Sequence, residues 1–420
     1  MSALFSNWPE GSLAQVYIPF MTRIAPSPDV CQKYWPLTPK GIVEDFYRAE
    51  DRGLFLSPRQ AAVSAAPAEI ATLSQARGLT RSRFVIRLAD PLREAFYASP
   101  TVVTPRLIRW SKEHRPEAIY SMFGSIHCIR IAVKLARTLE VPIVPHFTDD
   151  WAATLYEEAF FSGALRRSLH KWLRAALDLA PVRLTIGKGM AEEYERRFGG
   201  IFIPAANPAD SEKYDPTARI RLPQEPLRLV YMGNLQLQRW QSLKRIGEAL
   251  ALLSADGVSA VLEIYCPQRD REQFASELDL PHVVLKGFVT PDHIPSVLES
   301  ADVVCLVESF DPAIARYTRL SFSTKIAEYS MAGRPIFALG PKDQTSLQEI
   351  DANGSGVHVS LVSTETIAER LRHMLTAPER LHQMGATARA IAVREYSRLA
   401  VSARFEDALR TAVTRWNSER

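Results

Sequence analysis

The sequence predicts an α/β protein in which two doubly wound domains face each other across a cleft. Its 420 residues, 46% of them hydrophobic, are enough to build two separate cores. In the second half, short β-rich runs alternate strictly with stretches of helical periodicity, a pattern typical of βαβ units and a parallel sheet. A polar, proline-bearing segment, residues 207–226, has neither period and is therefore the expected hinge between the domains.

The second domain is expected over residues 227–395. Its predicted strands are residues 227–232, 260–265, 282–286, 302–307, 335–339 and 356–360. Between the first two strands, Leu243, Ile246 and Leu250 recur at helical spacing. Residues 396–420 follow the last βα unit and are also helical by pattern.

The first domain is expected over residues 1–206 and shows the same pattern less regularly. Its predicted strands are residues 84–88, 118–122, 141–146, 182–186 and 201–204, with helices over residues 129–139 and 190–198. A doubly wound domain normally opens with an apolar strand that leads into a glycine-bearing loop. Residues 1–17 look instead like part of the following helix, so we expect that opening strand to be missing.

Composition excludes several classes of protein. Fifty-one Lys and Arg against 47 Asp and Glu leave a net charge of +4, which is too small to indicate a nucleic-acid partner. Four cysteines with no close spacing argue against a zinc site or a disulfide framework, and we expect buried free thiols. Because no apolar run is long enough for a membrane span or a signal peptide, a cytoplasmic protein is expected, with the inner face of the cell membrane as an alternative location.

Ligands of doubly wound sheets bind beyond the carboxyl ends of the strands, so the loops after the strands are the places to search. After residues 227–232 come Gly233 and Asn234, and then Arg239 at the start of a helix. A glycine lets a ligand approach the backbone, while a helix N-terminus and an arginine both favour an anion. The pattern predicts a diphosphate site; a tight turn with a solvated arginine is the equally weighted alternative.

A second cluster of polar residues follows the strand at 302–307. Ser323 or Thr324 is a candidate N-cap, Lys325 falls in the first turn of the next helix, and Glu328 lies one turn further. Lysine is unfavourable near a helix N-terminus unless an anion binds there. Lys325 is therefore a predicted phosphate contact and Glu328 a predicted acceptor of ribose hydroxyls, although a capping contact or a surface ion pair is the commoner fate of a helix glutamate.

In the first domain, the strand at 141–146 ends in His146 and is followed by Asp149 and Asp150. A histidine at this edge could bind a sugar hydroxyl or carry a proton, and an aspartate could orient an acceptor. We expect His146 and Asp150 to act in catalysis. The alternatives are a structural histidine and a plain helix N-cap.

A basic amphipathic helix is expected from Leu165 to Leu179. Its apolar residues share one face, and Arg166, Arg167, Lys171 and Arg174 cover the rest. This pattern fits contact with an anionic membrane, and it fits a core-packed surface helix even better.

These motifs together resemble the GT-B-fold, retaining glycosyltransferases that use nucleotide sugars in bacterial polysaccharide and glycan assembly. The resemblance runs from about residue 121 onward. It implies two Rossmann-like domains, a terminal helix that crosses back to the first domain, and a donor site made by Gly233, Asn234, Arg239, Ser323, Thr324, Lys325 and Glu328. The first of the two glutamates in the family's donor motif falls on Leu320, which is a departure.

The resemblance implies transfer of a sugar to a glycan or lipid-linked acceptor with retention. Arg239, Lys325 and the helix N-termini would stabilise the leaving diphosphate. The nucleotide sugar is a substrate, so no cofactor is expected, and no DxD motif predicts a metal. A nucleotide-sugar epimerase of the same fold and a catalytically inactive binding or scaffold protein are the alternatives.

Overall fold

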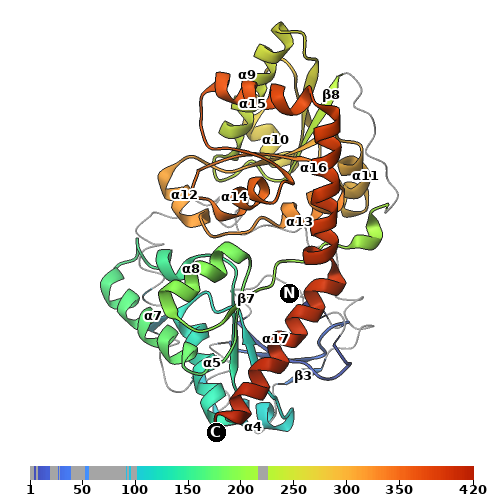
Figure 1. Ribbon diagram of the computed structural model, residues 1–420. Helices are drawn as coiled ribbons and strands as arrows, with labels where there is room; N and C mark the ends of the chain where they lie inside the picture. Colours follow the sequence, from blue (N-terminus) through green and yellow to red (C-terminus); the bar gives the residue numbers. More distant parts are fainter. Residues whose placement is uncertain are drawn as a thin grey trace.

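The computed structural model describes residues 4–5, 8–18, 27, 29–38, 53–55, 91, 94–95, 102–215 and 226–420. Within these ranges the chain forms two α/β bodies, one above the other in Figure 1, and the two C-terminal helices run from the upper body down along the lower one. The predicted strand at residues 84–88 and half of the predicted hinge, residues 216–225, lie outside the described residues.

The upper body is a six-stranded, entirely parallel sheet in the order β10-β9-β8-β11-β12-β13. Its strands are β8 (Leu227–Met232), β9 (Ala260–Tyr265), β10 (Val283–Lys286), β11 (Val303–Val307), β12 (Ile336–Leu339) and β13 (Gly356–Val359). Each lies within one or two residues of its predicted bounds, because continuous apolar runs between turn residues mark buried parallel strands clearly.

Helices connect these strands and cover both faces of the sheet. They are α9 (Arg239–Ala255), α10 (Gln268–Phe274), α11 (Ile294–Glu299), α12 (Pro312–Thr318), α13 (Thr324–Met331), α14 (Thr345–Ala352), α15 (Thr364–Leu375) and α16 (Pro378–Ile391), with a short turn η5 (Pro291–His293) before α11. The chain order reverses between β8 and β11, which is the switch point where ligands of such sheets bind.

The lower body has a four-stranded parallel sheet in the order β4-β5-β6-β7. The strands are β4 (Ile119–Ser121), β5 (Ile143–Phe147), β6 (Arg183–Thr185) and β7 (Phe202–Pro204). The helices are α4 (Pro105–Glu113), α5 (Ile126–Leu139), α6 (Trp151–Thr154), α7 (Ser162–Leu177) and α8 (Lys188–Phe198), and η4 (Ser211–Lys213) leads toward the upper body.

The start of the chain corrects one expectation. Ala14–Tyr17 do not continue into a helix but form strand β1, which pairs in parallel with β2 (Lys33–Pro36) in a separate three-stranded sheet with β3 (Leu54–Phe55). The physical reason is that side chains two residues apart share one face of a strand, and here Val16 and Ile18 both pack toward the buried Trp35. The chain therefore has a strand near its start, where we expected none.

The terminal helix α17 (Arg398–Ser418) follows the π-helical turn η6 (Ala392–Tyr396) and lies against the lower sheet. Its Val401, Phe405 and Leu409 pack on Val144 of β5 and Leu184 of β6. The last helix of the chain thus closes the core of the first domain. The domain limits at residues 206/207, 226/227 and 395/396 remain a proposal.

Helix α7 uses its apolar stripe inside the protein. Leu169 and Leu173 are buried, and the stripe belongs to the same core cluster as Ile129 and Val133 of α5. This packing corrects the idea that the apolar face of residues 165–179 could enter a membrane, because hydrophobic area that is already covered gains nothing from lipid. Arg167, Lys171 and Arg174 remain exposed.

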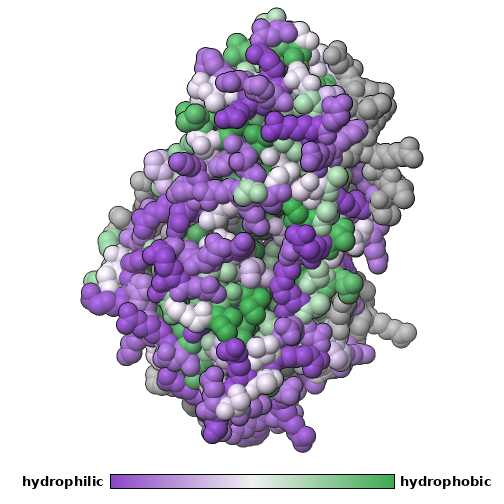
Figure 2. All heavy atoms as spheres, viewed as in Figure 1, coloured by the Kyte–Doolittle hydropathy of each residue, from purple (hydrophilic) through white to green (hydrophobic). Residues whose placement is uncertain are grey.

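Hydrophilic residues dominate the face of the molecule shown in Figure 2, and the cysteines form no disulfide. The hydrophobic residues on this face lie in small separate groups. Among the described residues, none of the helices has both the length and the apolar character needed to cross a bilayer. All four cysteines are free thiols; Cys31, Cys266 and Cys305 are buried and Cys128 is half-buried.

We predict that Phe405→Ala destabilises the first domain by about 3–5 kcal/mol, because Phe405 is fully buried between α17 and the sheet. The measurement is urea denaturation followed by circular dichroism. Leu399→Ala on the same helix is the control, since Leu399 is 77% exposed and its loss should change stability little. Equal effects of the two substitutions would contradict the docking of α17.

Candidate functional site

The candidate site begins where the two central strands of the upper sheet part. The ladder between β8 and β11 ends at Val230 and Val304, whereas β8 stays paired with β9 as far as Met232. Beyond that point the buried Tyr329 of α13 takes the place of β11: its hydroxyl accepts a hydrogen bond from the Met232 amide at 3.0 Å and donates to the Met232 carbonyl at 3.3 Å. The carboxyl ends of β8 and β11 therefore part at the switch point of the sheet, where Tyr329 pairs with the Met232 backbone; we call the place between these strand ends the crevice.

The loop after β8 is held in an unusual shape. Leu237 and Gln238, neither of them glycine, have left-handed φ angles of 55° and 57°. Such conformations cost free energy and concentrate where a ligand is gripped. The buried carboxylate of Asp270 anchors the loop, accepting from the Leu235 amide at 2.7 Å and from the Gln236 side-chain amide at 2.6 Å.

Arg239 is the first residue of α9, and its side chain reaches the carboxyl end of β11. Its guanidinium forms an ion pair with Glu308, the residue directly after β11, with Nη2 3.0 Å from Oε2 and Nε 3.2 Å from the same oxygen. The side chains are only 13% and 5% exposed. Nη1 of Arg239 also donates to the side-chain oxygen of Asn234 at 3.3 Å. A buried charge needs such a partner, so Glu308 fixes where this cation lies.

Lys325, in the first turn of α13, reaches the same place from the other side. Its ammonium lies over the ring of Tyr231, 5.5 Å from the centroid. A Cβ atom at Gly233 would be 2.3 Å from Cε of Lys325, so this glycine makes room for the lysine. Burial and the nearby Arg239 charge lower the pKa of Lys325 to about 8, while Glu308 and Glu328 oppose the change. The charges of Arg239 and Lys325 therefore act on each other, and their joint contact with a diphosphate stays a prediction.

Helices α9 and α13 both begin beside this cation pair. Gln238 before α9 and Ser323 before α13 make no side-chain capping bond to their helices, although backbone carbonyls accept from the amides of Arg239 and Ile326. The positive end of each helix dipole favours an anion at this place. Thr324, the first residue of α13, is exposed. Asn234 is joined to Arg239 and Gly233 lies against Lys325, whereas the donor-site role of these residues and of Ser323 and Thr324 stays a prediction.

Glu328 lies one turn beyond Lys325 and close to the segment that leaves the first domain. Burial raises the pKa of its carboxyl group, while Lys325 and Lys213 act in the opposite direction. Its charge also helps to raise the pKa of Tyr214, which is raised mainly by burial. Glu328 is thus a partly buried acid at the edge of the cation cluster, and its predicted contact with a ribose stays a prediction.

His146 and Asp150, the expected catalytic residues of the first domain, lie inside it. His146 uses both ring nitrogens, with Nδ1 2.8 Å from the Tyr120 hydroxyl and Nε2 3.0 Å from the Ala205 carbonyl, and burial lowers its pKa to about 4. Asp150 pairs with Arg197 at 2.9 Å and accepts from the Tyr194 hydroxyl at 2.9 Å. Both side chains are at most 3% exposed, which argues against a direct role in catalysis and favours the structural alternative.

The structure points to one acid that sequence reasoning gave no role, and it gives a partner to another that was a candidate. Glu308 pairs with Arg239, and Asp149, the neighbour of Asp150, accepts from the Ser321 hydroxyl of the upper body at 2.8 Å. Both stand just beyond the carboxyl end of a strand. Gly233 was identified by searching the residues that follow a strand. The same search, applied to the ends of the two central strands together, identifies Glu308 as well.

Comparison with known proteins follows the same division of the chain. Residues 226–377, which form most of the upper body, match the family model described as "Glycosyl transferases group 1". No curated protein matches the chain.

Several solved structures share the fold. HepE from Anabaena, in complex with UDP, has 17% identity and a TM-score of 0.56, with 75% of this chain and 83% of that one covered. Sucrose-phosphate synthase from Thermosynechococcus elongatus has 16% identity and a TM-score of 0.54, with 77% and 80% covered. A glycosyltransferase from Rickettsia africae has 10% identity and a TM-score of 0.53, with 75% and 82% covered. The chain therefore has the α/β architecture of GT-B glycosyltransferases.

We predict that Glu308→Gln destabilises the protein by about 2–4 kcal/mol, because it leaves the buried Arg239 without its counter-charge. Chemical denaturation with urea gives the value. Glu277→Gln is the matched control, since Glu277 is 45% exposed and its pair with Lys244 should be worth less than about 1 kcal/mol. A smaller effect for Glu308→Gln than for Glu277→Gln would contradict the assigned role of the pair.

Proposed function

We propose that this protein is a glycosyltransferase that takes a sugar from a nucleotide-sugar donor bound at the crevice between β8 and β11. The observation that carries the proposal is the proximity of Arg239 and Lys325 at the starts of α9 and α13, where Gly233 makes room for the lysine side chain. Two cations beside two helix N-termini suit a diphosphate. The group 1 glycosyl transferase match of residues 226–377 supports the same ligand class.

In the proposed reaction, the bond between the anomeric carbon and the diphosphate oxygen breaks, the acceptor hydroxyl oxygen forms the new bond to that carbon, and the hydroxyl proton passes to the leaving diphosphate. Negative charge then develops on the leaving diphosphate. Arg239 and Lys325 would stabilise that charge, and the helix N-termini would add fixed dipoles. We propose retention of configuration and no requirement for a metal. Glu328 would accept the ribose hydroxyls.

The acceptor is proposed to be a glycan or a lipid-linked sugar, in the setting of polysaccharide biosynthesis. A lipid-linked acceptor would bring the protein to the inner face of the cell membrane. Because the apolar face of α7 is covered, contact with anionic lipid would use its exposed Arg167, Lys171 and Arg174. This part of the proposal rests on charge alone.

We expect UDP, chosen because HepE from Anabaena was crystallised with it, to bind this protein, and Arg239→Ala to weaken that binding about 10–100-fold. The substitution removes a charged hydrogen-bond donor and leaves Glu308 facing the phosphates. Glu328→Ala should weaken binding through the lost ribose contact. Isothermal titration calorimetry with EDTA present measures both and tests the metal-free site.

Arg370→Ala is the control for these variants, because Arg370 is exposed on α15 at a distance in sequence from every site residue. Unchanged UDP affinity in Arg239→Ala and Glu328→Ala would refute the site. UDP binding that is lost on adding EDTA would refute the metal-independent form of the proposal.

UDP affinity should fall as the pH rises above about 8, because the pKa of Lys325 in the free protein is about 8 and only the protonated amine attracts the diphosphate. One titrating group gives a loss of at most about tenfold per pH unit. Titrations between about pH 7.5 and 9.5 avoid the ionisation of phosphate itself, which has a pKa of about 6. Lys325→Arg keeps its charge and should make the affinity nearly independent of pH over this range. The same slope in both proteins would exclude Lys325 as the titrating group.

A further inference from the structure

The loop between α6 and α7, residues 155–161, carries an exposed aromatic side chain. Phe161, its last residue, is 75% exposed. Because the loop follows β5 by way of the four-residue helix α6, it lies at the carboxyl edge of the lower sheet, where ligands of parallel sheets bind. Glu157 of the same loop lies 2.6 Å from Arg316 of α12, so the loop also reaches the upper body. A phenyl ring is therefore exposed on a loop that contacts both domains.

Phenylalanine is a locally unfavourable residue at position 161. Its φ angle is 60°, in the left-handed region that bulky side chains rarely adopt. Phe161 is also the N-cap of α7, a position that favours Ser, Thr, Asp, Asn or Gly, and its side chain makes no capping hydrogen bond. Asn or Gly would suit this backbone better. A residue that breaks two local rules and buries little of its own surface is expected to serve a ligand.

The loop that carries Phe161 is held firmly from two sides. Tyr156, which also has a left-handed φ angle of 64°, is buried, and its hydroxyl donates a hydrogen bond to the carboxylate of Glu94. From α7, Nη1 of Arg166 donates to the carbonyls of Ala153 at 2.8 Å and Leu155 at 3.1 Å. The loop is thus ordered before any ligand arrives, so binding at Phe161 would cost little conformational entropy.

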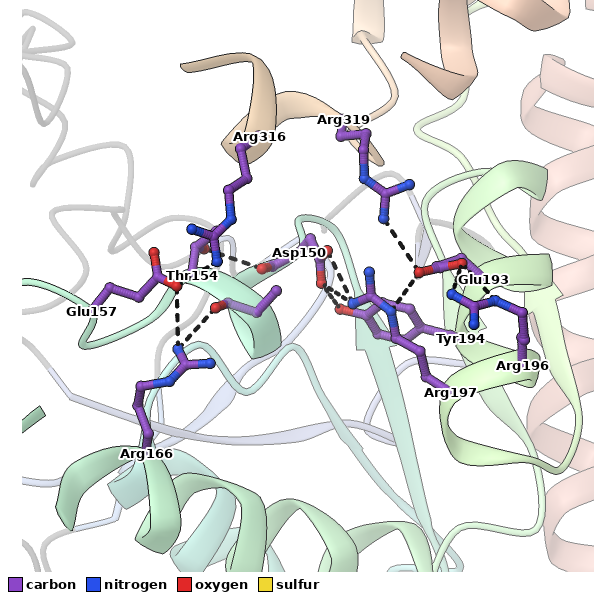
Figure 3. Close-up of polar contacts among 11 residues, drawn as sticks. Asp150, Thr154, Glu157, Arg166, Glu193, Tyr194, Arg196, Arg197, Arg316 and Arg319 are labelled. Carbon is purple, nitrogen blue, oxygen red and sulfur yellow. Dashed lines mark hydrogen bonds and ion pairs between the residues drawn. The ribbon is translucent and has the colours of Figure 1, made fainter. Parts of the chain in front are cut away.

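Polar side chains adjoin the ring along the same loop. Figure 3 shows Arg166 and Arg316 both directed at the carboxylate of Glu157, at 3.9 Å and 2.6 Å. Glu157 is 35% exposed and Arg316 61% exposed. In the part of the chain that the structure describes, Glu157 is the one hydrogen-bond partner of the Arg316 guanidinium, which has five N–H donors. Donor and acceptor groups are therefore available four residues from the exposed ring.

An exposed aromatic ring with polar neighbours suits a sugar better than a lipid or a protein surface. One face of a pyranose consists of C–H groups of partial positive charge, which pack on the negative face of an aromatic ring, while the hydroxyl groups at its edge need polar partners. Lipid and protein contacts use wider apolar patches than the small groups seen in Figure 2. Glu158, exposed on the same loop, would also be repelled by anionic lipid.

We propose that Phe161, together with Glu157 and Arg316, forms a carbohydrate-binding site in which a neutral pyranose ring stacks on the phenyl group. The proposal that this pyranose belongs to the acceptor rests on the proposed function, and it makes a glycan the acceptor class. The binding of a sugar at this loop depends only on the residues of the loop and of α12.

Saturation-transfer difference NMR with methyl β-D-glucopyranoside tests the site. The protons H1, H3 and H5 share one face of this sugar, and we expect them to receive the strongest saturation. Phe161→Asn should reduce the signal about fivefold or more through the lost stacking. Its unfolding temperature should be no lower than that of the wild type, because Asn adopts the left-handed region readily. Phe161→Trp should keep the signal, and Arg316→Gln should weaken it.

Phe288→Ala is the matched control, because Phe288 is 69% exposed in the upper body, its φ angle is not left-handed, and its loss should leave the sugar signal unchanged. Absence of saturation transfer in the wild type, or an equal loss in Phe288→Ala, would overturn the site.

Cosedimentation with phosphatidylglycerol vesicles separates the sugar from a lipid. Equal vesicle binding by Phe161→Asn and wild type supports the site, whereas weaker vesicle binding with an unchanged sugar signal would assign Phe161 to lipid and overturn the proposal. The UDP affinity of Phe161→Asn should equal that of the wild type, since the donor residues are untouched. Failure of the wild type to bind UDP would refute the proposed function, and the NMR result would still decide the carbohydrate-binding site.

Discussion

The arrangement of the upper crevice depends on the pairing of one buried guanidinium with one buried carboxylate. Arg239 cannot lie in a place that is only 13% exposed without a counter-charge, and Glu308 provides it from the neighbouring strand end. This pair holds the N-terminus of α9 beside the carboxyl end of β11. Lys325 then comes close to a second cation, and its pKa is lowered by burial and by Arg239. The crevice thus holds positive charge that a bound anion would stabilise further.

Sheet topology explains why these residues meet. The strand order β10-β9-β8-β11-β12-β13 places the first and fourth strands of the domain side by side, so residues 75 positions apart in the chain, such as Gly233 and Glu308, face one crevice. The ladder between β8 and β11 ends early, and Tyr329 satisfies the backbone that this leaves open. Helix α13 therefore has two roles: it carries Lys325, and its Tyr329 satisfies the Met232 backbone where β8 is no longer paired with β11.

The lower domain contributes in a different way. His146 at the end of β5 is buried and contacts the Ala205 carbonyl. The acids Asp149, Glu157 and Glu193 instead contact Ser321, Arg316 and Arg319 of the upper domain, respectively. Buried apolar residues of both bodies, among them Met190 and Leu347, belong to one core cluster. The chain therefore joins its two sheets by apolar packing as well as by polar side-chain contacts.

The amino-acid sequence by itself determined the architecture of the second domain and the identity of its cations. Apolar runs bounded by turn residues placed all six strands from β8 to β13, and the position after each strand singled out Gly233, Arg239 and Lys325. These features are local, because periodicity and helix ends act over a few residues. The start of the chain was the exception: Ala14–Tyr17 form a strand only because Val16 and Ile18 pack toward Trp35, which is distant in the sequence.

Only the tertiary structure decided which polar side chains are available for chemistry. His146 and Asp150 have the residue types and the positions of functional groups, yet Tyr120, Ala205, Arg197 and Tyr194 occupy their polar atoms. The partner of Arg239 and the contacts between the domains were equally hidden, because they join residues 69 to 172 positions apart. Burial and pairing of a charge are set by whatever the fold brings next to it, and no local pattern of residues records that neighbour.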